Sequence, residues 1–170
     1  MVGFSTDLKA LRQRFDQVIA RIDQRVKELI EANPDRKEHV THLRTIDGFG
    51  DVVSAAMVNS LERMPLKSAD AFVAFTGLDP RPDDSGRHQG KRRLSKRGPS
   101  ELRRLLYVAA LSAIKTKTWR LIYERYRGKG LSSTAAIVIV ARRLARTAWS
   151  MYTYKTEFDP ERLAKGWQKA

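Results

Sequence analysis

The sequence contains no cysteine, and it lacks long apolar runs as well. Without thiols the chain forms no disulfide bonds and no zinc sites built on thiolates, which suits a reducing compartment. No apolar run exceeds seven residues, the length of Ala135–Ala141, and that is far too short to cross a bilayer. The N-terminal stretch also lacks the apolar region of a secretory signal peptide. These absences predict a soluble, cytoplasmic protein without a membrane partner.

Negative charge is scarce too. The 170 residues include 19 Asp or Glu against 33 Lys or Arg, which gives a net charge of +14 at pH 7. Such an excess predicts a polyanionic partner, either a nucleic acid or an acidic membrane surface, and it favours the nucleic acid. Length and a hydrophobic content of 42% are those of one domain with a helical appendage.

Apolar periodicity and capping residues predict a mainly α chain. Pro99 suits the first turn of a helix, Gly77 a left-handed helix end, and Ser132 or Ser133 the start of a central, buried helix. The segment from Leu78 to Gly98 has no apolar period, so a long loop with short extended pieces is expected there. The predicted helices cover about 6–32, 36–44, 51–63, 69–75, 100–114, 119–126 and 133–154.

The first helix carries an apolar stripe with the a/d spacing of a heptad repeat, interrupted only by Arg25. The stripe fits a helix that packs on its own domain, and equally a helix that packs on a second chain. We divide the chain into a coiled-coil-like helix, 1–34, and a helical DNA-binding domain, 35–170, and we expect a homo-oligomer. The stripe residues are Leu8, Leu11, Phe15, Val18, Ile22 and Leu29.

Two glycines flank Phe49 between the second and third predicted helices. Glycine permits positive φ, so the N–H groups of Gly48 and Gly50 can lie against a phosphate, as in a helix-hairpin-helix element. The following helix would point its N-terminal amides the same way. Asp47 and Asp51 oppose this interpretation because both would repel a phosphate, and a plain connecting turn is the alternative.

The long loop is strongly basic. Between Arg87 and Arg104 only Glu101 is acidic, and such a density of one sign creates a positive field that suits a DNA backbone. A solvated charged loop is the alternative. The candidate DNA-binding residues in and beside this loop are Arg87, Lys91, Arg92, Arg93, Ser95, Lys96, Arg97, Arg103 and Arg104.

Ser85 is the candidate nucleophile within this loop. The neighbouring arginines would supply donors for developing phosphoryl charge, and His88 or an aspartate would accept the hydroxyl proton. In isolation, however, a Ser-Gly pair in a loop is usually a turn. Ser95 is a second candidate, with a hydrogen bond to backbone near the start of the next helix as its plain alternative.

Other chemistry is poorly supported. His39 and His42 are spaced three apart without a third ligand nearby, so we expect them to be solvent-exposed. Trp119, Trp149 and Trp167 are expected in the core or in an interface. The sequence contains no nucleotide-phosphate loop and no metal-ligating motif.

The motifs follow an order that is specific as a set: "IDGFGDVVSAA", then "FVAFTGLDPRPDDSGRHQGKRRLSKRGPSELRRLLYVAA". From about Leu43 to Ala110 this order resembles the C-terminal transposase domain of the insertion-sequence 110/116/902 family, relatives of the pilin-gene invertase Piv. The family's pattern falls on Gly48 and Gly50, Ala74 to Pro80, Ser85-Gly86, Gly90, Ser95 to Gly98 and Leu102 to Leu105.

The resemblance implies DNA transposition or site-specific recombination, with the serine nucleophile at Ser85. It also implies oligomers formed through a coiled coil, and DNA partners together with a structured RNA in some members. Family members bind Mg²⁺ in an N-terminal RuvC-like domain with four carboxylates. This sequence has no such domain, so we expect no cofactor in this chain and no complete transposition by it alone. The alternatives are a non-catalytic nucleic-acid-binding module, as in a truncated or remnant transposase, and a helical dimerisation protein with an incidental basic loop.

Overall fold

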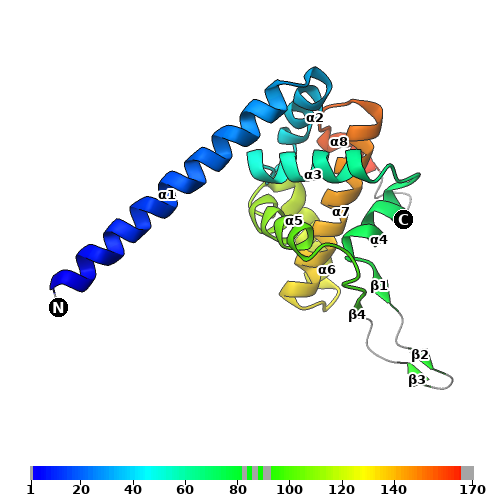
Figure 1. Ribbon diagram of the computed structural model, residues 1–170. Helices are drawn as coiled ribbons and strands as arrows, with labels where there is room; N and C mark the ends of the chain where they lie inside the picture. Colours follow the sequence, from blue (N-terminus) through cyan, green and yellow to red (C-terminus); the bar gives the residue numbers. More distant parts are fainter. Residues whose placement is uncertain (1, 82–83, 86–87, 90–92, 166–170) are drawn as a thin grey trace. The chain divides into compact units, whose positions relative to one another are not determined.

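The structure, a computed structural model, describes residues 2–81, 84–85, 88–89 and 93–165, with side chains at 4–80 and 94–163. This part of the chain is mainly helical, as predicted (Figure 1). It divides into two compact units, Met1–Glu38 and His39–Ala170. The elements are α1 (Val2–Glu31), α2 (Pro34–Arg44), α3 (Asp51–Arg63), α4 (Ala69–Thr76), β1 (Pro80–Arg81), β2 (Asp84–Ser85), β3 (His88–Gln89), β4 (Arg93–Leu94), α5 (Ser100–Ala113), α6 (Lys117–Gly128), α7 (Ser133–Tyr154) and α8 (Pro160–Lys165).

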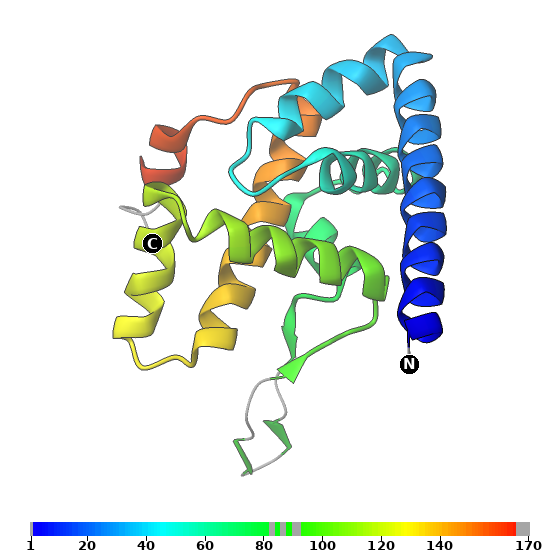
Figure 2. The same cartoon turned by 90° about the vertical axis from the view of Figure 1, so that its left-hand side faces the viewer.

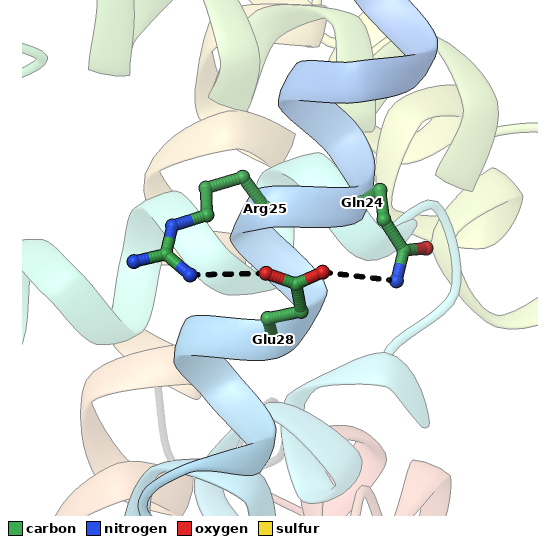
Figure 3. Close-up of polar contacts among 3 residues, drawn as sticks. All are labelled: Gln24, Arg25 and Glu28. Atoms are coloured by element: carbon green, nitrogen blue, oxygen red, sulfur yellow. Dashed lines mark hydrogen bonds and ion pairs between the residues drawn. The ribbon is translucent and has the colours of Figure 1, made fainter.

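The first unit consists of α1 and the first turn of α2. Asn33 separates the two helices and caps the second, because its Oδ1 accepts a hydrogen bond of 3.1 Å from the Arg36 N–H. Local polar contacts run along α1: Arg25 and Gln24 donate to the Glu28 carboxylate at 3.0 and 3.4 Å (Figure 3). The bond from Arg25, followed by that from Gln24, lowers the pKa of Glu28.

The apolar stripe of α1 lies open to solvent. Phe15 is 60% exposed and Ile22 is 57% exposed, although side chains of this kind are normally covered. A helix that keeps one whole apolar face in water is incompletely packed as a single chain. The exposed members of the stripe are Leu8, Leu11, Phe15, Val18, Ile22 and Leu29.

The second unit is organised around α7, which packs against α3, α4, α5 and α6. The predicted central buried helix is thus confirmed. Small side chains on α7 allow its neighbours to approach closely. Trp119 of α6 is completely buried and stacks on Phe158, with ring centroids 5.8 Å apart. The buried alanines of α7 are Ala136, Ala141, Ala145 and Ala148.

Helix boundaries follow the local signals closely. The side chain of Ser68 accepts from the Ala71 N–H at the start of α4, and Gly77 ends that helix with φ 71°. Ser132 caps α7 by accepting from the Ala135 N–H. These predicted caps are confirmed because each depends only on neighbouring residues.

Helix α8 was not predicted. Pro160 begins it, and the Asp159 carboxylate accepts hydrogen bonds from the N–H groups of Glu161 and Arg162, at 2.8 and 3.4 Å. Aspartate followed by proline is a helix-start signal, and it was readable in the sequence.

The expectation that His39 is solvent-exposed was wrong. Its side chain is only 8% exposed and stacks on Tyr152 of α7, with ring centroids 4.1 Å apart. His42 is partly buried. The spacing of the two histidines reflects helix packing, because α2 turns the same face toward the core every three to four residues.

Gly48 makes the closest approach between the α2–α3 turn and α5. Its φ is +87°, and a Cβ at this position would lie 2.3 Å from the carbonyl oxygen of Ala109. Gly50 has no positive φ and no atom within 4 Å of the corresponding position. The backbone conformation and the close contact at Gly48 therefore require glycine, whereas those at Gly50 do not.

Replacing Gly48 with alanine is expected to lower the free energy of unfolding by about 3 kcal/mol, because the substitution combines an unfavourable φ with overlap against α5 backbone. Gly50→Ala, the matched control, should change stability by no more than about 0.5 kcal/mol. Urea denaturation followed by circular dichroism measures both variants. Equal effects would contradict this account of the turn.

Candidate nucleic-acid interface

The described residues of the segment predicted as a loop with extended pieces form two short antiparallel pairings. β1 pairs with β4 through Pro80–Leu94 and Arg81–Arg93, and β2 pairs with β3 through Asp84–Gln89 and Ser85–His88. We refer to residues 79–95 as the ribbon. The β2–β3 pair is nested within the β1–β4 pair along the chain, and the registers of the two pairs differ by one position.

Ser85 and His88 are partners in the register of β2 and β3. The predicted nucleophile and one of its two predicted proton acceptors thus face each other across the hairpin. Gly86, Arg87, Lys91 and Arg92 lie outside the described residues, as does the side chain of Arg93 in β4.

The base of the ribbon is fixed by Ser95. Its N–H donates to the Asp79 carbonyl oxygen at 3.0 Å, and its hydroxyl donates to the Asp79 carboxylate. The next residue, Lys96, adopts φ 52° and donates its N–H to the Gly77 carbonyl oxygen at 3.1 Å. Ser95 therefore links the two ends of the ribbon to each other. Among the described residues, it does not form the predicted hydrogen bond near the start of the next helix.

Below this base, the end of α4 meets the segment that leads into α5 through close backbone contacts. A Cβ on Gly98 would lie 1.7 Å from the Phe75 carbonyl oxygen, and one on Gly77 would lie 2.9 Å from the Gly98 nitrogen. The Arg103 guanidinium donates to the carbonyl oxygens of Thr76 and Gly98. We call this the junction of the ribbon: Phe75–Gly77, Gly98 and Arg103.

The predicted basic contacts thus have different environments. Arg103 is engaged in the junction, and Arg104 pairs with Glu101 through two hydrogen bonds. This pairing lowers the pKa of Glu101 and raises the pKa of Arg104. Lys96 and Arg97 are exposed beside the base of the ribbon. Of the four, these last two are best placed to meet a phosphate.

The α2–α3 turn is held by internal contacts. Phe49 is 6% exposed, so its side chain belongs to the core. Asp47 accepts a hydrogen bond of 3.1 Å from the Thr116 hydroxyl, and Asp51 pairs with Arg44 at 3.0 Å. These contacts give both aspartates a structural role in the turn, whereas the phosphate hypothesis gave no reason for their presence. Of the two glycines in the turn, Gly50 has no atom within 4 Å of the position that a Cβ would take.

The structure does not bring the turn and the ribbon together. Gly48 contacts α5 near Ala109 and Ala113, whereas the junction contacts α5 at its beginning. From Arg103 to Ala113 an α-helix rises by about 15 Å. The α2–α3 turn and the ribbon, which were both predicted to contact DNA, therefore lie at opposite ends of α5.

Sequence reasoning missed Arg142 of α7. Its side chain is half-buried, and its Nε has no hydrogen-bond partner among the described residues. Burial lowers the pKa of this guanidinium, and Arg146 lowers it further, whereas Asp79 and Asp70 raise it. An arginine directly after an apolar helical run is the signal that would have found it.

The described residues contain no cluster of three or more metal-ligating side chains. No helix in the described part of the chain is long and apolar enough to span a membrane.

Comparison with known proteins decides the family. Residues 40–127, slightly more than half of the chain, match the family described as "Transposase IS116/IS110/IS902 family". The chain belongs to this transposase family. The match contains the α2–α3 turn, the ribbon and the junction, and it confirms the resemblance inferred from the ordered motifs.

Curated relatives come from several insertion elements. The chain is 30% identical to the "Insertion element IS900 uncharacterized 42 kDa protein" of Mycobacterium paratuberculosis over 135 residues, which are 78% of this chain and 34% of that protein. It is 31% identical over 147 residues to the "Insertion element IS116 uncharacterized 44.8 kDa protein" of Streptomyces clavuligerus, covering 85% of this chain and 36% of the relative. The "Transposase for insertion sequence element IS1328" of Yersinia enterocolitica is 31% identical over 159 residues, 89% of this chain and 47% of its own length. The chain thus spans between about a third and a half of the length of these relatives.

Proposed function

We propose that this chain is a DNA-binding transposase domain whose ribbon supplies Ser85 as the nucleophile for strand cleavage and exchange. The observation that carries the proposal is the ribbon register, with Ser85 beside the tip and His88 opposite it, in a chain of the IS116/IS110/IS902 family. An extended ribbon can reach a strand that a helical surface cannot approach.

The proposed reaction is an in-line phosphoryl transfer. The Ser85 hydroxyl oxygen attacks a backbone phosphorus, a Ser85–phosphate bond forms, and the bond to the leaving deoxyribose oxygen breaks. His88 or a neighbouring aspartate takes the hydroxyl proton. Arg87 and the nearby cations stabilise the negative charge that develops on the phosphoryl oxygens. The four-carboxylate domain implied by the family would supply Mg²⁺.

Two structural features support the ribbon's role. The described residues at its base are held by the Ser95–Asp79 contacts and by the junction. Lys96 and Arg97 stay exposed next to this base. The exposed stripe of α1 supports the further proposal that the domain works as a homo-oligomer, as coiled-coil seams do.

The isolated chain is expected to bind duplex DNA with little sequence preference, because phosphate contacts carry no base information. If about six phosphates are neutralised, the logarithm of the association constant should fall with log salt at a slope of roughly −5. Fluorescence anisotropy of a labelled duplex across a potassium chloride series measures this slope. A flat salt response, or no binding at low salt, would remove the nucleic-acid function.

A non-catalytic binding module of the same family is the alternative. It predicts the same salt dependence but no covalent protein–DNA adduct. Trapping of the adduct therefore separates the two functions.

A further inference from the structure

A second basic region lies outside the ribbon, in α6 and the adjoining parts of α5 and α7. From Lys115 to Arg146 the sequence has nine Lys or Arg residues and one acidic residue, Glu124, and so a net charge of +8. This stretch lies entirely within the described residues. More than half of the chain's net charge is thus carried by a helical hairpin.

The charge on α6 is concentrated on one face. At 100° per residue, Arg127, Arg120, Lys117 and Arg125 span an arc of about 160°, and the opposite side of the helix carries the buried Trp119. All four basic side chains are exposed. We call this set the α6 basic face: Lys117, Arg120, Arg125 and Arg127.

This face keeps a surplus of positive charge. Arg120 pairs with Glu124 at 2.8 Å, with both side chains more than half exposed. Arg127 donates to the Leu131 carbonyl oxygen at 2.6 Å, a contact that leaves its charge uncompensated. Within the sequence of α6, Glu124 is the one acidic residue beside Lys117, Arg120, Arg125 and Arg127, and such an excess of positive charge attracts a polyanion.

The aromatic residues of α6 are engaged within the protein. Trp119 is buried, the Tyr123 hydroxyl bonds with the Ser133 hydroxyl at 3.0 Å, and the Lys129 ammonium lies 5.6 Å from the centre of the Tyr126 ring. Binding of unpaired bases uses exposed aromatic platforms. The α6 basic face has none among its described residues, which favours a duplex contacted through its backbone.

The C-terminal end of the face, at Arg127, lies at the same end of the second unit as the ribbon, whereas Lys117 follows Thr116, which contacts Asp47 of the α2–α3 turn. Figures 1 and 2 both show the α6–α7 turn at the end from which β1 and β4 leave. Arg142 connects them electrostatically, since Asp79 at the ribbon base and Tyr126 of α6 both act on its guanidinium. A single duplex can therefore meet both surfaces.

We propose that the α6 basic face is a second binding surface for the phosphate backbone of duplex DNA, which holds the duplex while the ribbon reaches a strand. This inference rests on the proposed DNA-binding function. It assigns part of the affinity for duplex DNA to a helix that contributes no nucleophile. Substitutions in α6 should therefore weaken DNA binding without removing the nucleophile.

The test measures duplex affinity of the full chain by fluorescence anisotropy over a potassium chloride series. For Lys117→Gln with Arg125→Gln, loss of two phosphate contacts should reduce the magnitude of the salt slope by roughly 1.8 and weaken binding about 60-fold at 0.1 M salt. Glu124→Gln should strengthen binding several-fold, since it releases Arg120 from its partner. A gain of affinity does not arise from misfolding.

The matched control is Arg63→Gln with Lys67→Gln, which removes the same charge from exposed positions in α3 and the α3–α4 connection. It should change affinity by less than about threefold, since distant surface charges are screened. If the wild-type chain binds but both double variants lose affinity equally, the assignment of the α6 basic face is overturned. The same holds if Glu124→Gln brings no gain in affinity. In both cases the proposed DNA-binding function stands. A larger loss for an RNA duplex than for DNA would overturn the choice of DNA. Absence of wild-type binding would reject both proposals.

Discussion

Ser85→Ala is expected to abolish covalent attachment of the chain to DNA completely, because alanine has no hydroxyl to attack phosphorus. Stability and noncovalent affinity should remain nearly unchanged, since the substitution removes one hydroxyl near the tip of the ribbon and leaves the α6 basic face and the ribbon base intact. The assay requires the carboxylate domain of a relative, supplied in trans with Mg²⁺ and a nicked duplex. Denaturing electrophoresis then detects the phosphoseryl adduct.

Ser95→Ala is the matched control for this experiment. The Ser95 hydroxyl donates to the Asp79 carboxylate, so its loss should lower stability by about 1 kcal/mol and loosen the ribbon base without removing the adduct. If Ser95 proves essential and Ser85 does not, the nucleophile has been assigned to the wrong serine. If adducts form at the same rate in both variants, another residue is the nucleophile. If the wild-type chain forms no adduct, the chain acts as a binding module.

Phe15→Glu with Ile22→Glu is expected to convert an oligomer into monomers. In the proposed seam these side chains would be buried against a second copy of α1, where two carboxylates per helix should raise the dissociation constant by at least about 100-fold. Sedimentation equilibrium over a range of protein concentrations measures the change. The wild-type chain should remain at least dimeric at micromolar concentrations.

Gln13→Glu with Gln17→Glu provides the charge-matched control for the seam. At 100° per residue both positions lie on the side of α1 opposite Phe15, so the added charge should stay in water. This variant should retain the wild-type oligomeric state. A wild-type chain that is already monomeric at high concentration would refute the coiled-coil proposal.

Local signals in the sequence accounted for most helix boundaries. The caps at Ser68, Gly77 and Ser132 depend on residues a few positions away, and the structure confirms each one. The missed helix α8 also has such a signal, in Asp159-Pro160. Hydrophobic pattern and capping were therefore sufficient for the mainly α fold.

Long-range contacts were beyond the reach of those signals. Gly98 is needed because Phe75, twenty-three positions earlier, places its carbonyl oxygen where a Cβ would be. Gly48 is needed because α5 passes close to it, whereas the sequence suggested a phosphate. A glycine can indicate that another group approaches the backbone closely, but the sequence does not identify that group. The ordered family motifs supplied the location of the candidate site, and periodicity did not.

The junction has a consequence for how this protein tolerates change. The Arg103 guanidinium and the backbone contact of Gly98 with Phe75 fix both ends of the ribbon where it leaves the helices. The packing of the helical body therefore does not depend on the length of the chain between these two ends. Doubling the length of a flexible loop between fixed ends costs only about 0.6 kcal/mol. Changes in the length of the ribbon should therefore alter the free energy of unfolding of the helical body only slightly.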